Sequence, residues 1–325
     1  MKKTLILLTG GFLLMLGCNK SDKEIQENML AEEETFTATE RRCSSQDVLE
    51  QQMAADPSLR ARMQDIEEFT QRAAANPEAF RLVNGVIEIP VVVNVLYRTT
   101  AQNISQAQIQ SQIDVLNEDF SATNSDYNLT STYGSVKSGN IGVRFVLDQV
   151  KRRSTTKTGW STNDAMKKSA QGIAPTSPTT KLNLWVCNLS GGILGYAQFP
   201  GGSSATDGVV IDDNAMGRTG TAAAPFNKGR TATHEVGHWL NLRHIWGDAT
   251  CGNDLVGDTP QHNTANYGCP SAGHKSTCSG TPVEMTMNYM DYTDDACMYM
   301  FTAGQKTRML AVFASGGPRS SFAQP

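Results

Sequence analysis

The chain has 325 residues, a formal net charge of −4 at pH 7 and a hydrophobic fraction of 39%. Its length allows one large or two ordinary domains, and its apolar content is sufficient for a globular core. The mild negative charge argues against nucleic acid as the main partner.

The first 17 residues predict an export signal rather than part of the fold. Lys2 and Lys3 precede an apolar run, Leu5 to Leu16, that is too short for a permanent transmembrane helix. Gly17 and Cys18 complete a sequence that resembles a bacterial lipobox, in which Cys18 becomes the lipidated first residue of the mature chain. The alternative is ordinary secretion with an incidental cysteine. Both interpretations predict export to a compartment that permits disulfides. We expect contact with a membrane only through a lipid anchor at Cys18.

Residues 18–85 predict a tether followed by a propeptide. Residues 19–42 contain few large apolar side chains, so they cannot bury much surface and are expected to be flexible. Residues 45–82 alternate charged and apolar residues at helical spacing, which predicts one or two helices.

A second, larger domain is predicted over residues 86–325. Ile87 to Tyr97 is β-branched and apolar, which is typical of a strand buried on both faces. Ser105 and Gln108 form a capping-box pattern for a following helix. Behind them, apolar side chains repeat at helical spacing at Ile109, Ile113, Leu116 and Phe120. We therefore expect an amphipathic helix packed on a sheet.

Further stretches predict the rest of this sheet. Residues 141–150, 181–189 and 209–212 have strand-like patterns, and Cys187 within the second of them is expected to be a buried free thiol. The glycine-rich residues 191–197 would form an edge strand. Because an exposed edge can pair with an extended peptide, this strand could bind a substrate backbone.

Three histidines and a glutamate lie in the sequence HEVGHWLNLRH. On a helix, His234 and His238 leave the same face one turn apart, so their imidazoles can bind one zinc ion. Glu235 is placed to take a proton from a zinc-bound water. His244 can join them only if the chain turns sharply, and Asn241 tolerates the left-handed backbone that such a turn needs. The alternative is a buried helix that happens to carry histidines.

This pattern matches the H-E-x-x-H-x-x-G-x-x-H motif of the metzincin zinc peptidases, with Asn241 in place of the usual glycine. Met290, in NYMDY, matches the apolar turn beneath the metzincin zinc. The contexts HEVGHWLNLRHIWGD and NYMDYTDDACMYMFT resemble the pappalysin (cytophagalysin) family, strongly from Ile87 to Gln305. The resemblance implies an α+β metzincin-like domain, with a twisted mixed sheet, an antiparallel edge strand, a zinc helix and a loop-rich, disulfide-stapled C-terminal half.

The resemblance also implies roles for these residues. His234, His238 and His244 would bind zinc, Glu235 would be the general base and acid, and Tyr292 would be a hydrogen-bonding partner of the zinc site. The expected activity is that of a monomeric zinc endopeptidase acting on proteins or peptides. The alternatives are a catalytically silent zinc and calcium module at the cell surface and a zinc hydrolase of non-peptide substrates. The silent module would be expected to lack Glu235 or a ligand, and neither is missing.

Residues 247–259 gather acidic side chains and glycines on a turning loop. Clustered oxygens suit calcium, although the spacing is not that of an EF-hand. A polar surface loop is the alternative. The resemblance favours a structural calcium site, with Asp254, Asp258 and Thr259 as expected ligands.

Four of the seven cysteines lie in the loop-rich half, and they allow three pairings. The resemblance implies the disulfides Cys251–Cys278 and Cys269–Cys297. Such bridges would staple a region with little regular structure.

Cys43 follows two arginines, Arg41 and Arg42. A thiolate is a good zinc ligand, and the neighbouring arginines would favour it. Latent metalloproteases of related type use a propeptide cysteine to occupy the position of the catalytic water, and we interpret Cys43 as such a cysteine switch. The alternatives are a disulfide partner and a spare thiol.

Asp294 and Asp295 come shortly after Met290, where metzincins form the wall of the pocket for the residue after the scissile bond. An ionised Asp295 in a partly dry pocket would favour a guanidinium that binds through two parallel hydrogen bonds. We therefore expect cleavage before arginine or lysine, with arginine preferred, and a solvated Asp294. The enzyme could then release its own propeptide by cutting before one of four arginines in it, which are Arg60, Arg62, Arg72 and Arg81.

Overall fold

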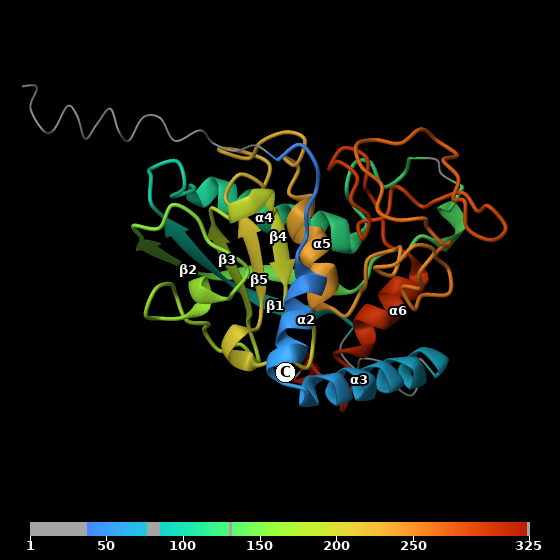
Figure 1. Cartoon of the computed structure of the whole chain (residues 1–325), viewed down its shortest axis with the longest axis horizontal. Helices are drawn as coiled ribbons and strands as arrows, with labels where there is room; N and C mark the ends of the chain where they lie inside the picture. Colours follow the sequence, from blue (N-terminus) through green and yellow to red (C-terminus); the bar gives the residue numbers. More distant parts are fainter. Residues whose placement is uncertain (1–37, 77–84, 130–131, 324–325) are drawn as a thin grey trace, which may run out of the picture. The chain divides into compact units, whose positions relative to one another are not determined.

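The computed structural model describes residues 38–76, 85–129 and 132–323 (Figure 1). The predicted signal peptide, Cys18 and Arg81 lie outside the described residues. No helix in the described part of the chain is long and apolar enough to cross a membrane.

A mixed sheet of five strands carries the N-terminal half of the larger domain, in the order β2-β1-β3-β5-β4. The parallel strands are β1 (Ile87–Tyr97), β2 (Val143–Ser154), β3 (Leu182–Cys187) and β5 (Val209–Asp212). The edge strand β4 (Gly195–Ala197) pairs with β5 in the antiparallel sense. The predicted mixed sheet with an antiparallel edge strand is therefore confirmed.

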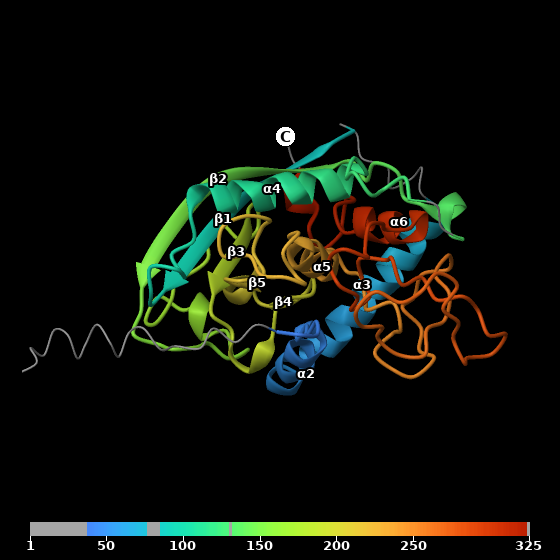
Figure 2. The same cartoon turned by 90° about the horizontal axis from the view of Figure 1, so that it is seen from above.

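Two helices, α4 (Gln106–Ser121) and α5 (Arg230–Trp239), contribute to the main core on one face of the sheet (Figure 2). Ser105 caps α4 by accepting a hydrogen bond from the Gln108 amide at 3.1 Å. The side chain of Gln108 instead donates to the carbonyl of Met216, so only half of the predicted capping box forms. The apolar stripe of α4 is buried in the main core, and the helix contacts β2 and α5. A smaller apolar cluster covers the other face and encloses the free thiol of Cys187, as expected.

The N-terminal segment, which we define as residues 38–76, packs against the rest of the chain. Helix α2 (Ser45–Ala55) contacts β4, and helix α3 (Ser58–Ala75) contacts α6 (Ala303–Ala311). Glu67 of α3 accepts two hydrogen bonds from the guanidinium of Arg308 on α6. This pair joins two helices that are far apart in the sequence.

Residues 38–42, which we expected in a flexible tether, are part of the fold. Ala38 is buried, and the side chain of Arg41 is only 1% exposed. We expected flexibility because this stretch has few large apolar side chains. A buried charge such as that of Arg41 can still be stabilised by a complementary partner elsewhere in the chain, and composition does not predict that partner.

Between α5 and α6 the chain forms turns and isolated bridges rather than helices or strands. The disulfides Cys251–Cys278 and Cys269–Cys297 close this region, as the family resemblance implies. Helix α6 then begins with a complete capping box between Thr302 and Gln305.

Candidate active site

Helix α5 is short and entirely buried, and it presents His234, Glu235 and His238 toward one point. It ends at Trp239, after which Asn241 adopts a left-handed backbone with φ of 73°. The amide of Leu242 then donates to the carbonyl of Gly237 at 2.9 Å, which turns the chain back on the helix. The turn occurs where the sequence predicts it, and it returns His244 to the other two histidines.

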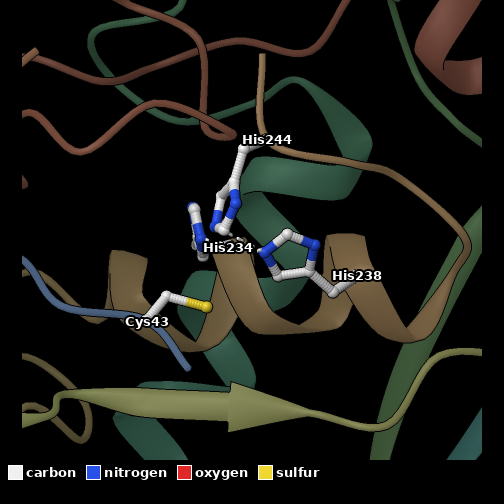
Figure 3. Close-up of side chains that lie close together, drawn as sticks. All are labelled: Cys43, His234, His238 and His244. Atoms are coloured by element: carbon white, nitrogen blue, oxygen red, sulfur yellow. Dashed lines mark hydrogen bonds between the residues drawn. The ribbon is translucent and has the colours of Figure 1, made fainter. Parts of the chain in front are cut away.

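Three imidazole nitrogens converge at the end of this turn (Figure 3). The Nε2 atom of His238 lies 3.2 Å from Nε2 of His234 and 3.1 Å from Nε2 of His244. Two nitrogens bound to one zinc at about 2.0–2.1 Å in a tetrahedron lie about 3.3 Å apart, so the spacing fits a zinc ion.

The other nitrogen of each ring has an acceptor, so the Nε2 lone pairs are left facing one another. Nδ1 of His234 lies 2.7 Å from the Tyr289 carbonyl, and Nδ1 of His238 lies 2.8 Å from the Leu242 carbonyl. Nδ1 of His244 lies 2.5 Å from Oδ1 of Asp248. Burial lowers the pKa of His238 to about 3, which keeps that ring neutral at pH 7. Three converging imidazole nitrogens of this kind suit a buried divalent cation.

Cys43 supplies a fourth candidate ligand. Its Sγ and the three Nε2 atoms all lie within 4.8 Å of one another (Figure 3). We expected the two arginines before Cys43 to favour its thiolate, but both side chains are directed elsewhere. Arg41 is turned toward Asp295, and Arg42 donates to the carbonyl of Gly191. Burial and the Glu235 carboxylate raise the pKa of the Cys43 thiol, so a cation at the three imidazoles is the group that would favour a thiolate here.

Glu235 lies beside this cluster and is also covered by the N-terminal segment. Its Oε2 accepts a hydrogen bond from Ser45 Oγ at 2.8 Å and lies 3.3 Å from Cys43 Sγ. Burial raises the pKa of Glu235 to about 7. A Cβ at Gly195 would lie 2.9 Å from Cγ of Glu235, so the edge strand can approach the carboxylate this closely only with glycine there.

Met290 lies beneath the histidine helix. A Cβ at Gly237 would come within 2.5 Å of the Met290 sulfur, so the helix and the turn that carries Met290 are in close contact. Tyr292, two residues later, donates from its hydroxyl to the carbonyl of Cys43 at 3.0 Å. Both residues therefore lie at the cluster that the resemblance implies.

Asp295 forms the floor of a buried site that holds Arg41. Its Oδ2 accepts the amides of Lys228 at 2.7 Å and Arg230 at 3.2 Å, at the start of α5. Its Oδ1 accepts Nη2 of Arg41 at 2.6 Å. The rest of the guanidinium donates to Oγ1 of Thr231 and to the carbonyl of Thr293.

We expected Asp295 to bind a substrate guanidinium through two parallel hydrogen bonds. The guanidinium of Arg41 forms only one hydrogen bond with Asp295. The two backbone amides occupy one carboxylate oxygen, and only the other faces the guanidinium. Asp294 is partly exposed, and its amide donates to the carbonyl of Gly268.

The three expected calcium ligands form two separate sets of hydrogen bonds. Thr259 Oγ1 lies 2.9 Å and 3.0 Å from the two carboxylate oxygens of Asp254. Asp258 instead accepts Oγ1 of Thr302 at 2.6 Å and the amide of Gly304 at 2.8 Å. Asp258 thus stabilises the start of α6, where helix amides attract a carboxylate.

Comparisons with known proteins agree with this geometry. The peptidase M43 family, described as pregnancy-associated plasma protein-A, matches residues 178–314. An extracellular metalloprotease of Arthroderma otae is 34% identical over 253 residues, which cover 75% of this chain and 84% of that protein. This chain is a zinc metalloendopeptidase of the pappalysin family. As a pappalysin it also has solved relatives from Tannerella forsythia. Mature mirolysin in complex with a cleaved peptide is 46% identical, with a TM-score of 0.70, and the match covers 73% of this chain and 95% of the mirolysin chain. A promirolysin mutant is 42% identical, with a TM-score of 0.79, and the match covers 87% of this chain and 97% of the promirolysin chain. The predicted metzincin-like fold is thereby confirmed.

Sequence analysis of this pappalysin missed two contacts of the site. We assigned Asp248 to the calcium loop, whereas its carboxylate lies within hydrogen-bond distance of Nδ1 of His244. The position of Asp248, four residues after His244, was the feature of the sequence that could have indicated this contact. Ser45 was not singled out, although it contacts Glu235 and also accepts the amide of Ala197 on β4.

Replacing Asp248 by asparagine should weaken zinc binding by about 10–100-fold, because the carboxylate that orients His244 and raises its basicity is lost. Competition with a fluorescent chelator would measure the zinc affinity. Asp114→Asn, an exposed change on α4, is the matched control. Equal zinc affinity in Asp248→Asn and Asp114→Asn would contradict a role for Asp248 at the metal.

Proposed function

We propose that this pappalysin is exported as a latent zinc endopeptidase that cleaves before basic residues. One observation carries the proposal, namely that three residues within a stretch of five contact Asp295, the imidazoles and Glu235. Arg41 binds Asp295, Cys43 meets the imidazoles, and Ser45 covers Glu235. A substrate needs the same three positions for its side chain, its scissile bond and the attacking water.

In this proposal His234, His238 and His244 hold one zinc ion. Bound there, the ion would lower the pKa of a water molecule to about 7 and polarise a peptide carbonyl. Glu235 accepts the proton of the attacking water and then delivers it to the leaving amine. Tyr292 already donates to a backbone carbonyl in this structure, that of Cys43, so its hydroxyl can donate to the oxygen of a cleaved peptide bond.

Glu235→Gln should leave zinc bound and lower kcat by at least about 10²–10⁴-fold, because general acid–base catalysis is lost. Casein hydrolysis with and without a zinc chelator would be measured alongside zinc content. Glu118→Gln, a surface change in an exposed ion pair, is the control. Retained peptidase activity in Glu235→Gln would refute the role of Glu235. Zinc binding without any hydrolysis by the activated wild type would favour the silent binding module.

Latency in the proposal rests on what the N-terminal segment presents to the site. The atom that faces the imidazoles is the sulfur of Cys43, which is not a cleavable group. The segment also pairs with the edge strand at Cys43 and Gly195, so it occupies the edge that a substrate backbone would use. The larger share of this chain matched by promirolysin than by mature mirolysin supports the interpretation of this segment as a propeptide.

The unprocessed Cys43→Ala chain should hydrolyse a short peptide at once, because the sulfur that excludes water from the imidazoles is removed. Cys187→Ala removes the other free thiol of the described residues, which is buried on the far face of the sheet, and this variant should remain latent. Mass spectrometry at each time point would confirm that the chains are uncut. Equal lag phases in the two variants would rule out the cysteine switch.

The specificity in the proposal follows from the contacts of Arg41. A buried site that holds one guanidinium through Asp295, Thr231 and Thr293 can hold another after the N-terminal segment leaves. Of the four candidate arginines for self-release, Arg60, Arg62 and Arg72 lie within α3. Arg81 lies outside the described residues, and a cut before one of these four arginines is the proposed route of release.

A calcium ion remains part of the proposal, centred on Asp254 and Thr259. Burial raises the pKa of Asp254 to about 6, as expected for a carboxylate withdrawn from water without a full charge partner. Asp258 is less suited than we expected because it binds the start of α6.

Removal of calcium alone, with zinc resupplied, should lower the thermal midpoint of the wild type. An ion present at about 100 times its dissociation constant stabilises the folded state by about 2.7 kcal/mol. Asp254→Asn should start from a lower midpoint and show no further loss. An unchanged wild-type midpoint would leave Asp254 and Thr259 as part of a polar loop.

Export is supported by the extracellular relatives and by the N-terminal sequence. Lipidation at Cys18 would anchor the chain at the cell envelope, and a cut before one of the four propeptide arginines would release the catalytic part.

A further inference from the structure

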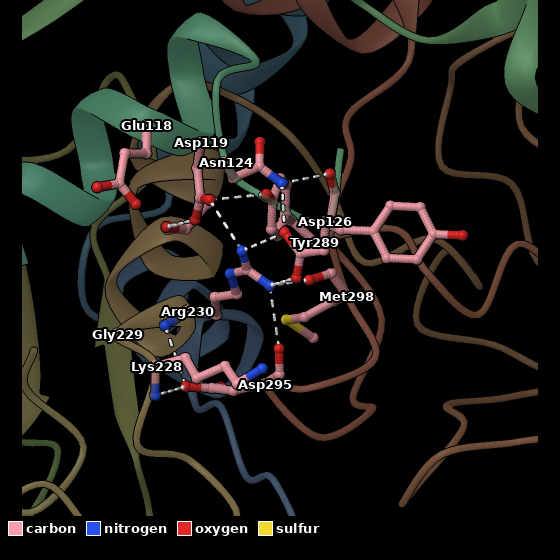
Figure 4. A network of polar contacts seen from close by, with 12 residues as sticks. Glu118, Asp119, Asn124, Asp126, Lys228, Gly229, Arg230, Tyr289, Asp295 and Met298 are labelled. Atoms are coloured by element: carbon pink, nitrogen blue, oxygen red, sulfur yellow. Dashed lines mark hydrogen bonds and ion pairs between the residues drawn. The ribbon is translucent and has the colours of Figure 1, made fainter. Parts of the chain in front are cut away.

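A buried arginine at the start of α5 contacts the segment that carries Asp295 (Figure 4). The side chain of Arg230 is 7% exposed, and its Nη1 donates to the carbonyls of Asp295, at 3.1 Å, and Met298. Its own backbone amide donates to the carboxylate of Asp295 at 3.2 Å. One residue therefore holds Asp295 at both its main chain and its side chain.

The positive charge of Arg230 is compensated by carboxylates other than that of Asp295. Asp126 accepts two hydrogen bonds from the guanidinium, at 2.7 Å and 2.9 Å, and Asp119 of α4 lies 3.3 Å from it (Figure 4). Of the atoms of Asp295, the Arg230 guanidinium contacts only the carbonyl oxygen. The carboxylate of Asp295 accepts the backbone amides of Lys228 and Arg230 instead. The negative charge of Asp295 is thus left to pair with whatever cation enters from the other side.

The same network reaches the histidines through Asp119. This carboxylate accepts the hydroxyl of Thr233 at 2.7 Å and the hydroxyl of Tyr289 at 2.8 Å. The carbonyl of Tyr289 is the acceptor at Nδ1 of His234. A substitution at Arg230 could therefore act on the zinc ligand His234, through Asp119 and Tyr289, instead of on Asp295. An experiment has to separate these two effects.

We propose that Arg230 is the positioning residue that sets the preference for a basic side chain after the scissile bond. It holds Asp295 so that Oδ1 faces the incoming side chain, at the place where Arg41 now lies. The inference rests on the proposed specificity. Lysine cannot replace Arg230 in this role, because an ammonium cannot contact two carboxylates and two carbonyls in the plane of a guanidinium.

The test compares two peptides that differ only after the scissile bond, one with arginine and one with citrulline, its uncharged isostere. The activated chain is assayed as wild type, Arg230→Lys and Arg218→Lys. Arg218 is the matched control, because it forms a bidentate pair with Glu118, the neighbour of Asp119 on α4, and is 41% exposed.

Arg230→Lys should lower the ratio of kcat/KM for arginine over citrulline by about tenfold, through KM, because one charge-assisted contact to the substrate is misaligned. The kcat/KM for citrulline, the zinc content and the ratio in Arg218→Lys should stay within about twofold of wild type. If Arg230→Lys does not fold, Asp126→Asn replaces it, with an expected fall of about threefold in the same ratio.

An unchanged ratio, or an equal loss for both peptides, would overturn the inference and leave Arg230 as a structural residue. Failure of the proposed specificity would appear elsewhere, as a wild type that does not distinguish arginine from citrulline. Loss of zinc from Arg230→Lys would likewise refute the inference, since it would place the effect on His234.

Discussion

The repulsion between three imidazole lone pairs is the constraint on which the rest of the site depends. Nε2 of His238 lies 3.1–3.2 Å from Nε2 of the other two histidines, a spacing that a cation between them would stabilise, and each ring is held from behind. The three acceptors that do this come from different places, namely the Met290 turn, the turn after α5 and the loop at Asp248. The loop-rich half must therefore be fixed in space without helices or strands, and the two disulfides contribute to this.

The N-terminal segment complements this site group by group. A buried arginine meets a buried carboxylate, a thiol meets the imidazoles, and a hydroxyl meets the carboxylate of Glu235. Each of these groups would be unfavourable in an apolar interior by itself. Because the partners are supplied together, the segment can bury polar groups that its composition alone would leave in water. Helix α3 adds a contact outside the site through Glu67 and Arg308.

Charges at the start of α5 follow a consistent order. Two backbone amides at the start of the helix hold the carboxylate of Asp295, which is where the helix dipole favours a negative charge. The guanidinium of Arg230 faces the other way, toward Asp119 and Asp126. This separation keeps the pocket carboxylate and the structural ion pairs from neutralising one another, although both contact Arg230 at the start of α5.

The sequence by itself determined the features that depend on local spacing. His234 and His238 on one helical face, the left-handed turn at Asn241, the capped helix α4 and the apolar strand β1 all follow from neighbours within a few residues. Family resemblance added the two disulfide pairings. Only the tertiary structure decided that Arg41 binds Asp295, 254 residues away, that Ser45 covers Glu235, and that Asp258 turns to α6 instead of Asp254. These contacts join segments with no shared periodicity, and a polar side chain chooses among distant partners by the geometry that packing creates.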